Sequence, residues 1–454
     1  MTQAFWDIKN SKQIHFIGIG GVSMSALSLI MQNQGKTVTG SDMSKNENTE
    51  KLIKNGIKIK EGHFENGADD ADVVIYTAAI RADNPELKSA MQKGKICYER
   101  AVLLGYIASL YKTPIGISGT HGKTSTTAML STILLKANKN PTITIGGELP
   151  VINGNFYLGG NDFFVFEACE YHNSFFNFYP KISIITNIET DHLDFFSGLD
   201  EIIGSFNTYS KNISADGAII ANLSDKNIVK ALDGLDKKII NADIATGEFC
   251  AKDILLTGGV GFSIYYRDEF FASVKLCVPG LHNVQNALLA AAAAHSAGLS
   301  AKEIENGLNA YTGIKRRFET KHKAKGITIV DDYAHHPTEI EATISAAKTM
   351  GFKRVIVCFQ PHTYTRTKAL WNDFISALSL ADMVLLTKIY AAREKDDGTV
   401  SSEDLSKGIN NSKYFETFEQ LGAFLSAHCK EGDLVLTMGA GDIYKAGDMF
   451  YNLL

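Results

Sequence analysis

Candidate strands recur along the chain, and most are followed by a polar or glycine-containing segment. The first, residues 13–17, leads through a glycine turn into a segment in which Met24, Leu27, Ile30 and Met31 recur at helical spacing. Further candidate strands occur at residues 37–42, 72–79, 115–118, 162–166, 182–186, 218–221, 327–331, 355–359, 383–387 and 434–438. Strands that alternate with helices predict an α/β fold built on largely parallel sheets.

The length of the chain indicates more than one domain. At roughly 150 residues per domain, 454 residues predict three domains. We expect residues 1–108 to form a Rossmann-like, doubly wound sheet and residues 109–314 to form a central α/β domain of the P-loop type. Residues 315–454 are expected to form a second Rossmann-like sheet. Loops of all three domains could then meet in one cleft.

The clearest motif lies in residues 115–127, where an apolar run turns through glycines into a helix headed by Lys123 and Thr124. Backbone N–H groups and the positive end of a helix bind phosphate, the lysine adds a full charge, and the threonine hydroxyl can reach Mg²⁺. The strict G-x-x-x-x-G-K-[ST] pattern is missed, because Ile117 stands where its first glycine would be. An ordinary glycine turn would not explain a Gly-Lys-Thr sequence after a hydrophobic strand. We therefore predict nucleoside triphosphate binding.

A second glycine turn, Gly18 to Ser23, follows the first strand. Asp42 ends the next strand, about where a ribose-binding carboxylate falls in dinucleotide folds. The G-x-G-x-x-G fingerprint fails at its third glycine, which is Ser23, so the turn suits a pyrophosphate without implying NAD or FAD. Taken alone, a purely structural turn explains the glycines nearly as well.

Two apolar runs of the central region end in polar groups. Glu167 and Glu170 follow residues 162–166, and acids at a strand end are expected to coordinate Mg²⁺ directly or through water. The alternative is a pair of solvated loop acids. His192 follows residues 182–186 among several polar residues, and a metal or phosphate role is about as well supported there as a packed or surface histidine.

Asn283 and Asn286 lie three residues apart at the start of a predicted helix and so share one face. Their amides could recognise a purine edge. Capping of the helix by Asn283 is the alternative, and the sequence leaves it open.

The third region contains polar segments near the ends of predicted strands. A basic cluster at residues 315–319 stands at the domain boundary, where a cation could reach a phosphate held by the preceding domain. Residues 331–339 contain two aspartates and two histidines, and residues 360–367 contain His362 and Arg366. A closed zinc site would recruit more imidazole or thiolate ligands at fixed spacing, so substrate contacts are favoured.

Composition limits the partners. A net charge of -5 and a pI near 6.2 argue against nucleic acid. The first residues lack a basic segment followed by an apolar one, so no secretory signal is expected. The longest apolar run, residues 287–294, is too short to cross a membrane. Six cysteines without C-x-x-C spacing fit reduced thiols in the cytoplasm.

Taken together, these motifs resemble the Mur ligase family of peptidoglycan synthesis over the whole chain. The segments that carry the resemblance are residues 18–24, 119–124, 167–170, 187–192, 282–286, 316–319, 331–337 and 360–367. The resemblance implies a UDP-sugar-binding domain, a central ATPase domain and a C-terminal domain that closes over the amino acid. Within the family the chain is most similar to the branch that adds L-alanine to the carboxylate of UDP-N-acetylmuramate through an acyl phosphate, with ATP as co-substrate and two Mg²⁺ ions. The alternative is the recycling branch, which adds a murein tripeptide to the same sugar.

The resemblance also implies roles for individual residues. The catalytic set is Lys123, Glu167, His192, His335, His362 and Arg366. Metal ligands are Thr124, Glu167 and His192. ATP is expected on Gly119, Thr120, His121, Gly122, Lys123, Thr124, Ser125, Asn283, Asn286, Arg317 and Asp332. The UDP-sugar is expected on Gly18, Gly20, Gly21, Ser23 and Asp42.

Two positions depart from the commoner pattern of the family. Cys169 stands where many members have aspartate, and Thr363 stands where others have arginine. The second departure removes a cation near the expected reaction centre and makes Arg366 the anion contact. The sequence does not predict the oligomeric state.

Overall fold

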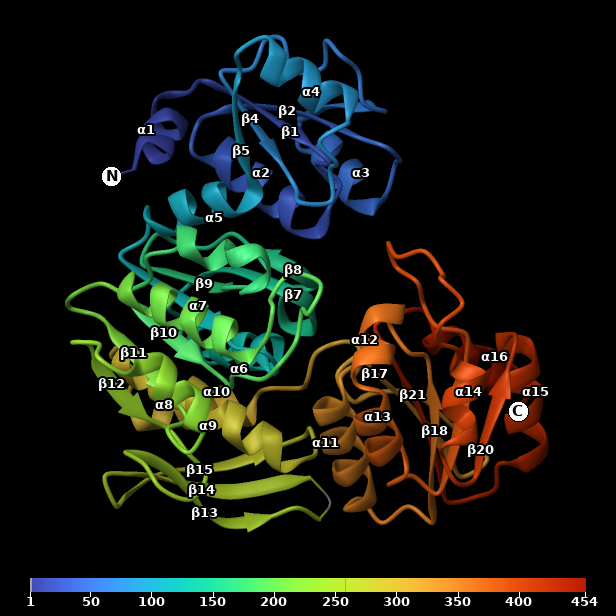
Figure 1. The fold of residues 1–454 in the computed structure, drawn as a ribbon. Coiled ribbons are helices and arrows are strands. Elements are labelled where there is room, and N and C mark those ends of the chain that lie inside the picture. Colours follow the sequence, from blue (N-terminus) through green and yellow to red (C-terminus); the bar gives the residue numbers. More distant parts are fainter. Residues whose placement is uncertain (1, 258) are drawn as a thin grey trace.

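The computed structural model describes residues 2–257 and 259–454, which form three α/β domains in chain order. Figure 1 shows the first domain in blue at the top, the central domain below it in green and yellow, and the third domain beside the central one in orange and red. The predicted fold class is confirmed. The limits at residues 108 and 314 stay predictions, although each sheet lies within one predicted range.

The first domain is a parallel sheet with the strand order β3-β2-β1-β4-β5. Its strands are β1 (Gln13–Ile17), β2 (Thr37–Asp42), β3 (Lys58–Glu61), β4 (Val73–Tyr76) and β5 (Ile96–Glu99). Its helices are α1 (Gln3–Asn10), α2 (Val22–Asn33), α3 (Glu47–Lys54), α4 (Pro85–Gln92) and α5 (Arg100–Ala108). The order reverses at β1, so the carboxyl ends of β1 and β4 open a crevice of the kind that binds ligands in such sheets.

The central domain combines a seven-stranded sheet, β12-β11-β10-β6-β9-β7-β8, with a three-stranded antiparallel sheet, β13-β14-β15. The strands are β6 (Thr113–Ser118), β7 (Thr142–Leu149), β8 (Gly154–Tyr157), β9 (Phe163–Glu167), β10 (Ile182–Ile185), β11 (Ala218–Ala221), β12 (Lys238–Asn241), β13 (Phe249–Leu255), β14 (Val260–Tyr266) and β15 (Glu269–Leu276). The helices are α6 (Lys123–Lys136), α7 (Leu199–Lys211), α8 (Lys226–Leu232), α9 (Leu281–Ser296) and α10 (Ala301–Asn309), with 3-10 turns η1 (Pro150–Ile152) and η2 (Tyr171–Asn177).

The third domain is a six-stranded sheet in the order β16-β17-β21-β18-β19-β20, in which only the edge strand β16 is antiparallel to its neighbour. Its strands are β16 (Glu319–Ala324), β17 (Ile327–Asp332), β18 (Arg354–Phe359), β19 (Met383–Thr387), β20 (Ser412–Phe415) and β21 (Asp433–Met438). Its helices are α11 (Pro337–Lys348), α12 (Tyr364–Ala369), α13 (Trp371–Leu378), α14 (Ser402–Lys407), α15 (Phe418–His428) and α16 (Tyr444–Asn452).

The apolar run at residues 287–294 lies in α9, and every one of its side chains is fully buried in the core of the central domain. Close approach of α9 to α6 is possible because alanine side chains occupy little room. Among the residues that the structure describes, no helix has the length and apolar character needed to cross a membrane. All six cysteines are free.

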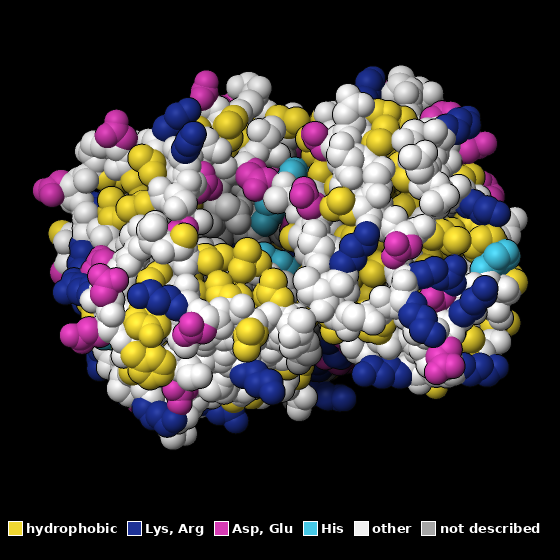
Figure 2. Space-filling view, turned by 90° about the horizontal axis from the view of Figure 1, so that it is seen from below, with side chains coloured by type: hydrophobic (Ala, Val, Ile, Leu, Met, Phe, Trp, Pro, Cys, Tyr) yellow, Lys and Arg dark blue, Asp and Glu magenta, His cyan; other side chains and the backbone are white. Residues whose placement is uncertain are grey.

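The first and central domains share one hydrophobic cluster, in which Leu104 and Tyr106 of α5 join Phe164 and Phe166 of β9. The third domain has its own cores on the two faces of its sheet. A space-filling view from below shows a hollow between the central and third lobes, with histidine and acidic side chains at its walls (Figure 2).

Candidate active site

The predicted phosphate loop joins β6 to α6 at the carboxyl edge of the central sheet. Gly122, the residue before α6, has a left-handed backbone with φ of +80°, and a Cβ atom there would lie 2.7 Å from Oδ1 of Asn286. Glycine is therefore favoured at this position by the left-handed turn, and the side chain of Asn286 in α9 would have to move to admit a Cβ atom. The side chain of Thr120 accepts a hydrogen bond from the N–H of Glu189 at 2.9 Å, which ties the loop to the segment after β10.

Lys123 begins α6, and its ammonium group lies 3.1 Å from both carboxylate oxygens of Glu170. Glu170 is only 2% exposed, so the alternative of two solvated loop acids is wrong for this residue. Nε2 of His192 lies 3.8 Å from the same carboxylate. Burial lowers the pKa of His192, so its imidazole is neutral at neutral pH and can bind a metal.

Thr124 and Glu167 line one cavity of about 480 Å³ together with Lys315 and Arg317 at the start of the third domain. The N–H of Gly146 donates to Glu167 at 2.7 Å and holds its carboxylate at the end of β9. A hydroxyl and a carboxylate in one cavity are the oxygen ligands that Mg²⁺ prefers. The residue types present therefore fit a magnesium ion, which Thr124 and Glu167 would hold.

Glu167 also lines a second cavity, of about 210 Å³, with Ser23 and Arg100 of the first domain. Ser23 lies in the first turn of α2, next to the predicted pyrophosphate turn, and its hydroxyl accepts a hydrogen bond from Arg100 at 3.2 Å. Within the turn, the N–H of Gly20 donates to Asp42 at 2.8 Å. The predicted UDP-sugar residues thus gather at one sheet edge. Of these five, the cavity lining contains Ser23, and the same cavity reaches Glu167.

Most of the predicted ATP residues line a third cavity, of about 150 Å³, between the central and third domains. Those that line it are His121, Gly122, Ser125, Asn283, Asn286, Arg317 and Asp332. The side-chain amide of Asn283 donates to the carbonyl of Pro279 at 2.7 Å, and α9 is preceded by Gly280. Capping of this helix by Asn283 is therefore wrong, because the side chain accepts no bond from the first N–H groups of the helix.

Asp332 lines this cavity and also fixes the backbone of the segments on either side of it. Its two carboxylate oxygens accept hydrogen bonds from the N–H groups of Phe318 at 2.8 Å and Ala334 at 2.7 Å. Burial raises the pKa of Asp332 to about 6. Arg316 lies beside it, pairs with Asp331 at 3.0 Å and so secures the same boundary segment to β17.

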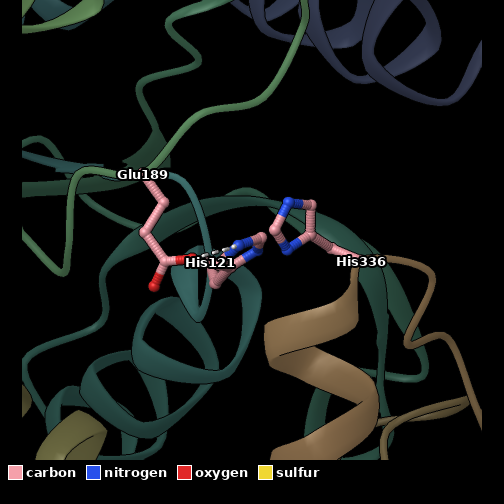
Figure 3. Close-up of side chains that lie close together, drawn as sticks. All are labelled: His121, Glu189 and His336. Atoms are coloured by element: carbon pink, nitrogen blue, oxygen red, sulfur yellow. Dashed lines mark ion pairs between the residues drawn. The ribbon is translucent and has the colours of Figure 1, made fainter. Parts of the chain in front are cut away.

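His121, Glu189 and His336 form what we call the interdomain histidine cluster (Figure 3). The imidazole of His121 lies 3.6 Å from Glu189 and 3.2 Å from Glu339, and its ring centre is 4.6 Å from that of His336. Burial opposes protonation, but the two carboxylates outweigh it and raise the pKa of His121 to about 9. An imidazolium ion therefore links the phosphate loop to the third domain at neutral pH. The ligand atoms of the cluster lie within 4.8 Å of one another. The cluster could bind a metal only after His121 has lost its proton, because a metal ligand must be a neutral imidazole.

His335, His362 and Arg366 meet on the side of the third domain that faces His192. The rings of His335 and His362 are 5.9 Å apart, and Arg366 Nη1 lies 3.3 Å from His362 Nδ1. Burial lowers the pKa of both histidines to about 4, so both are neutral. Arg366 binds Asp191 of the central domain at 2.9 Å. Burial alone would raise the pKa of Asp191, but the charge of Arg366 outweighs burial and holds this pKa well below its usual range.

Several residues of the site were not predicted individually. Asp191, Glu189 and Glu339 all connect the central and third domains. Each lies inside a segment that the sequence had marked, residues 187–192 or 331–339. The signal was present, but spacing alone does not reveal which acids pair across a domain boundary.

Family comparisons cover most of the chain. Residues 13–112 match the description "Mur ligase family, catalytic domain", residues 117–294 match "Mur ligase middle domain", and residues 316–441 match "Mur ligase, glutamate ligase domain".

Individual proteins match over nearly the full length. UDP-N-acetylmuramate--L-alanine ligase of Clostridium novyi is 47% identical over 446 residues, which are 97% of each chain. The crystal structure of the UDP-N-acetylmuramate-alanine ligase of Thermotoga maritima is 30% identical with a TM-score of 0.79, covering 97% of this chain and 98% of that chain. A murein peptide ligase of Psychrobacter arcticus is 25% identical with a TM-score of 0.71 and the same coverage. The chain therefore belongs to the Mur ligase family.

Proposed function

We propose that this protein is an ATP-dependent ligase that joins L-alanine to the carboxylate of UDP-N-acetylmuramate and releases ADP and phosphate. The reaction belongs to peptidoglycan synthesis. Because it consumes ATP, we place it in the cytoplasm. The relatives named as alanine ligases are more similar to this chain than the murein peptide ligase, which supports alanine over a tripeptide as the acceptor.

The chemistry requires activation of the sugar, because a carboxylate is a poor electrophile. Transfer of the γ-phosphoryl group of ATP to one carboxylate oxygen gives an acyl phosphate. The amine of alanine then attacks the acyl carbon, and inorganic phosphate leaves with the oxygen that it had accepted. Phosphoryl transfer of this kind depends mainly on alignment and on neutralisation of charge.

The residues of this chain divide that work. The N-terminus of α6 supplies about half a positive charge, and Lys123 supplies a full one. These positive charges do not balance the negative charge of a triphosphate that lies beside a carboxylate. Thr124 and Glu167 would hold one Mg²⁺ and His192 would contribute to a second, and these ions would neutralise the phosphate oxygens. His121, Asn283, Asn286 and Arg317 orient the nucleotide in the cavity between the domains.

One observation supports this function most directly. Glu167 lines both the cavity that begins at Ser23 of the first domain and the cavity that contains Thr124 of the phosphate loop. A substrate bound on the first domain would therefore present its carboxylate beside the proposed metal and γ-phosphate. This arrangement fits a ligase better than a nucleotide-dependent switch protein, which would need no second-substrate cavity at that point.

The test is release of phosphate from ATP by the purified protein with UDP-N-acetylmuramate and either L-alanine or the murein tripeptide. We expect release that depends on the UDP-sugar and on L-alanine, and little release with the tripeptide. Release only with the tripeptide would replace this proposal by the recycling ligase. Slow hydrolysis of ATP that neither acceptor stimulates would favour a switch protein.

A further inference from the structure

A cavity of about 420 Å³ lies between the loop after β10 and the third domain, and we call it the Arg366 cavity. Its lining includes His192 from the central domain and His362 and Arg366 from the third domain. Most of the lining is polar or charged, and Leu193, Ala369 and Leu370 add apolar surface. The cavity adjoins the proposed reaction centre and is separate from the nucleotide cavity.

Nearly every charged side chain of this cavity has an intramolecular partner. Asp191 binds Arg366 at 2.9 Å. Asp194 accepts a hydrogen bond from the hydroxyl of Tyr171 at 2.5 Å. Glu394 accepts bonds from the N–H groups that begin α12, those of Tyr364 at 2.7 Å and Thr365 at 3.0 Å.

Arg393 is the exception. It lines the same cavity, yet among the described residues no carboxylate lies within 4.0 Å of its guanidinium. Thr363, also in the lining, offers no charge. Because Arg366 is engaged by Asp191, Arg393 is the cation of this cavity that remains available to an anion.

The loop that carries Arg393 is fixed on both sides of it. Tyr390 forms a parallel bridge with His362, its N–H donating to the carbonyl of Pro361 at 2.8 Å and its carbonyl accepting from the N–H of Thr363 at 2.9 Å. Glu394, the next residue after Arg393, is held at the N-terminus of α12 by the bonds described above. The backbone of Tyr390 and the carboxylate of Glu394 are thus tied to the loop that carries His362 and Arg366. These ties place Arg393, whose side chain is exposed, at the rim of the cavity.

We infer that Arg393 binds the α-carboxylate of the incoming amino acid and so selects an acceptor that carries one. The inference rests on the proposed function. A planar guanidinium can bind both oxygens of a carboxylate, which fixes the position of the substrate as well as its charge. The apolar side chains Leu193, Ala369 and Leu370 would then meet a small, uncharged side chain such as the methyl group of alanine.

The test compares two acceptors that differ only in the carboxylate, L-alanine and L-alaninamide, by phosphate release. The variants are Arg393→Gln and Arg393→Lys. The matched control is Lys395→Gln, which removes one positive charge from the same exposed loop but lies outside the cavity. KM values for ATP and UDP-N-acetylmuramate are measured alongside.

Loss of a charge-assisted hydrogen bond predicts a rise of roughly 10- to 100-fold in KM for L-alanine in Arg393→Gln. The KM values for ATP and the UDP-sugar should change less than about twofold, and Arg393→Lys should recover part of the loss. The wild type should have a higher kcat/KM with L-alanine than with L-alaninamide. In Arg393→Gln the ratio of these two kcat/KM values should fall by the same factor by which KM for L-alanine rises. Lys395→Gln should match the wild type.

An equal loss of kcat/KM with both acceptors would overturn the inference, because a merely structural role does not distinguish them. Wild-type behaviour of Arg393→Gln toward L-alanine would overturn it too. If the wild type itself shows no alanine-dependent phosphate release, the proposed function fails first and the inference with it. Failure of the proposed function can be told apart from failure of the inference, because it is seen with the wild type before any variant is compared.

Discussion

Lys123 Nζ lies 3.1 Å from both carboxylate oxygens of Glu170, so the lysine of the phosphate loop is paired with a buried acid at the end of the neighbouring strand. Burial alone would lower the pKa of Lys123, but Glu170 outweighs it and raises the pKa above its ordinary value. The lysine therefore stays charged in a sheltered site. Movement of the ammonium group toward a γ-phosphate exchanges one anionic partner for another.

Replacement of this lysine should separate chemistry from folding. We expect Lys123→Ala to lower kcat at least about 1000-fold, since it removes the full positive charge nearest the transferred phosphoryl group. The circular dichroism spectrum should stay that of the wild type, although the unpaired Glu170 should lower the melting temperature by a few degrees. Lys136→Ala, at the far end of the same helix, is the control and should keep full activity. Substantial turnover by Lys123→Ala would contradict the assigned role.

Glu167 offers a test of the metal site. Glu167→Gln keeps an oxygen that can accept the hydrogen bond from Gly146 but removes the negative charge. We expect the variant to fold normally and to lose at least about 100-fold in activity, with the Mg²⁺ concentration for half-maximal rate shifted upward, because second-substrate and metal contacts meet at this residue. An unchanged Mg²⁺ dependence with normal activity would show that Glu167 does not hold the ion.

The interdomain histidine cluster predicts a dependence of stability on pH. The pKa of His121 is raised to about 9 in the folded protein against about 6.5 when unfolded, so its contribution is complete below pH of about 6.5 and is lost as pH rises through about 9. A pKa shift of this size contributes at most about 3 kcal/mol to the free energy of unfolding. Unfolding of the wild type and of His121→Gln is measured at pH 6.5 and 9.0. The difference in stability between the two proteins should shrink at the higher pH, and a difference independent of pH would contradict the ion-paired state.

Ligand binding should draw the third domain closer. The nucleotide cavity is formed jointly by His121 and Asn286 of the central domain and Arg317 and Thr338 of the third. A nucleotide there would contact both walls and favour the closed arrangement, which excludes water from an acyl phosphate. We expect small-angle X-ray scattering to give a smaller radius of gyration with UDP-N-acetylmuramate and a nonhydrolysable ATP analogue. Scattering that is the same with and without both ligands would argue against closure.

The sequence predicted the buried strands in the middle of the sheets, because these are short apolar runs that end in glycine or polar residues. It did not mark edge strands such as β3, β5, β16 and β20, whose side chains are largely exposed or half-buried and give no apolar run. The phosphate loop followed from the order Gly122, Lys123 and Thr124 directly after a hydrophobic strand. Pairings between distant residues were not predictable. Asp191 lies beside His192 in sequence, yet its partner Arg366 is 175 positions away, and only the packing of two domains brings them together.

The roles of some side chains depend on their local environment, which the sequence does not reveal. Asn283 follows Gly280 at the start of a helix, as a capping residue could, but its amide turns back to the carbonyl of Pro279. Glu170 follows a strand like an ordinary loop acid, but the ion pair with Lys123 compensates its burial. Arg393 carries no sequence signal, because its place in the Arg366 cavity depends on bonds made by its neighbours Tyr390 and Glu394.

The central claim is that the sugar carboxylate is phosphorylated before the amine attacks. UDP-N-acetylmuramate labelled with ¹⁸O in its lactyl carboxylate is converted with L-alanine and ATP, and the released phosphate is examined by ³¹P NMR or mass spectrometry. An acyl phosphate predicts one ¹⁸O atom from the carboxylate in each phosphate and one in the new amide. Phosphate without label would contradict the account.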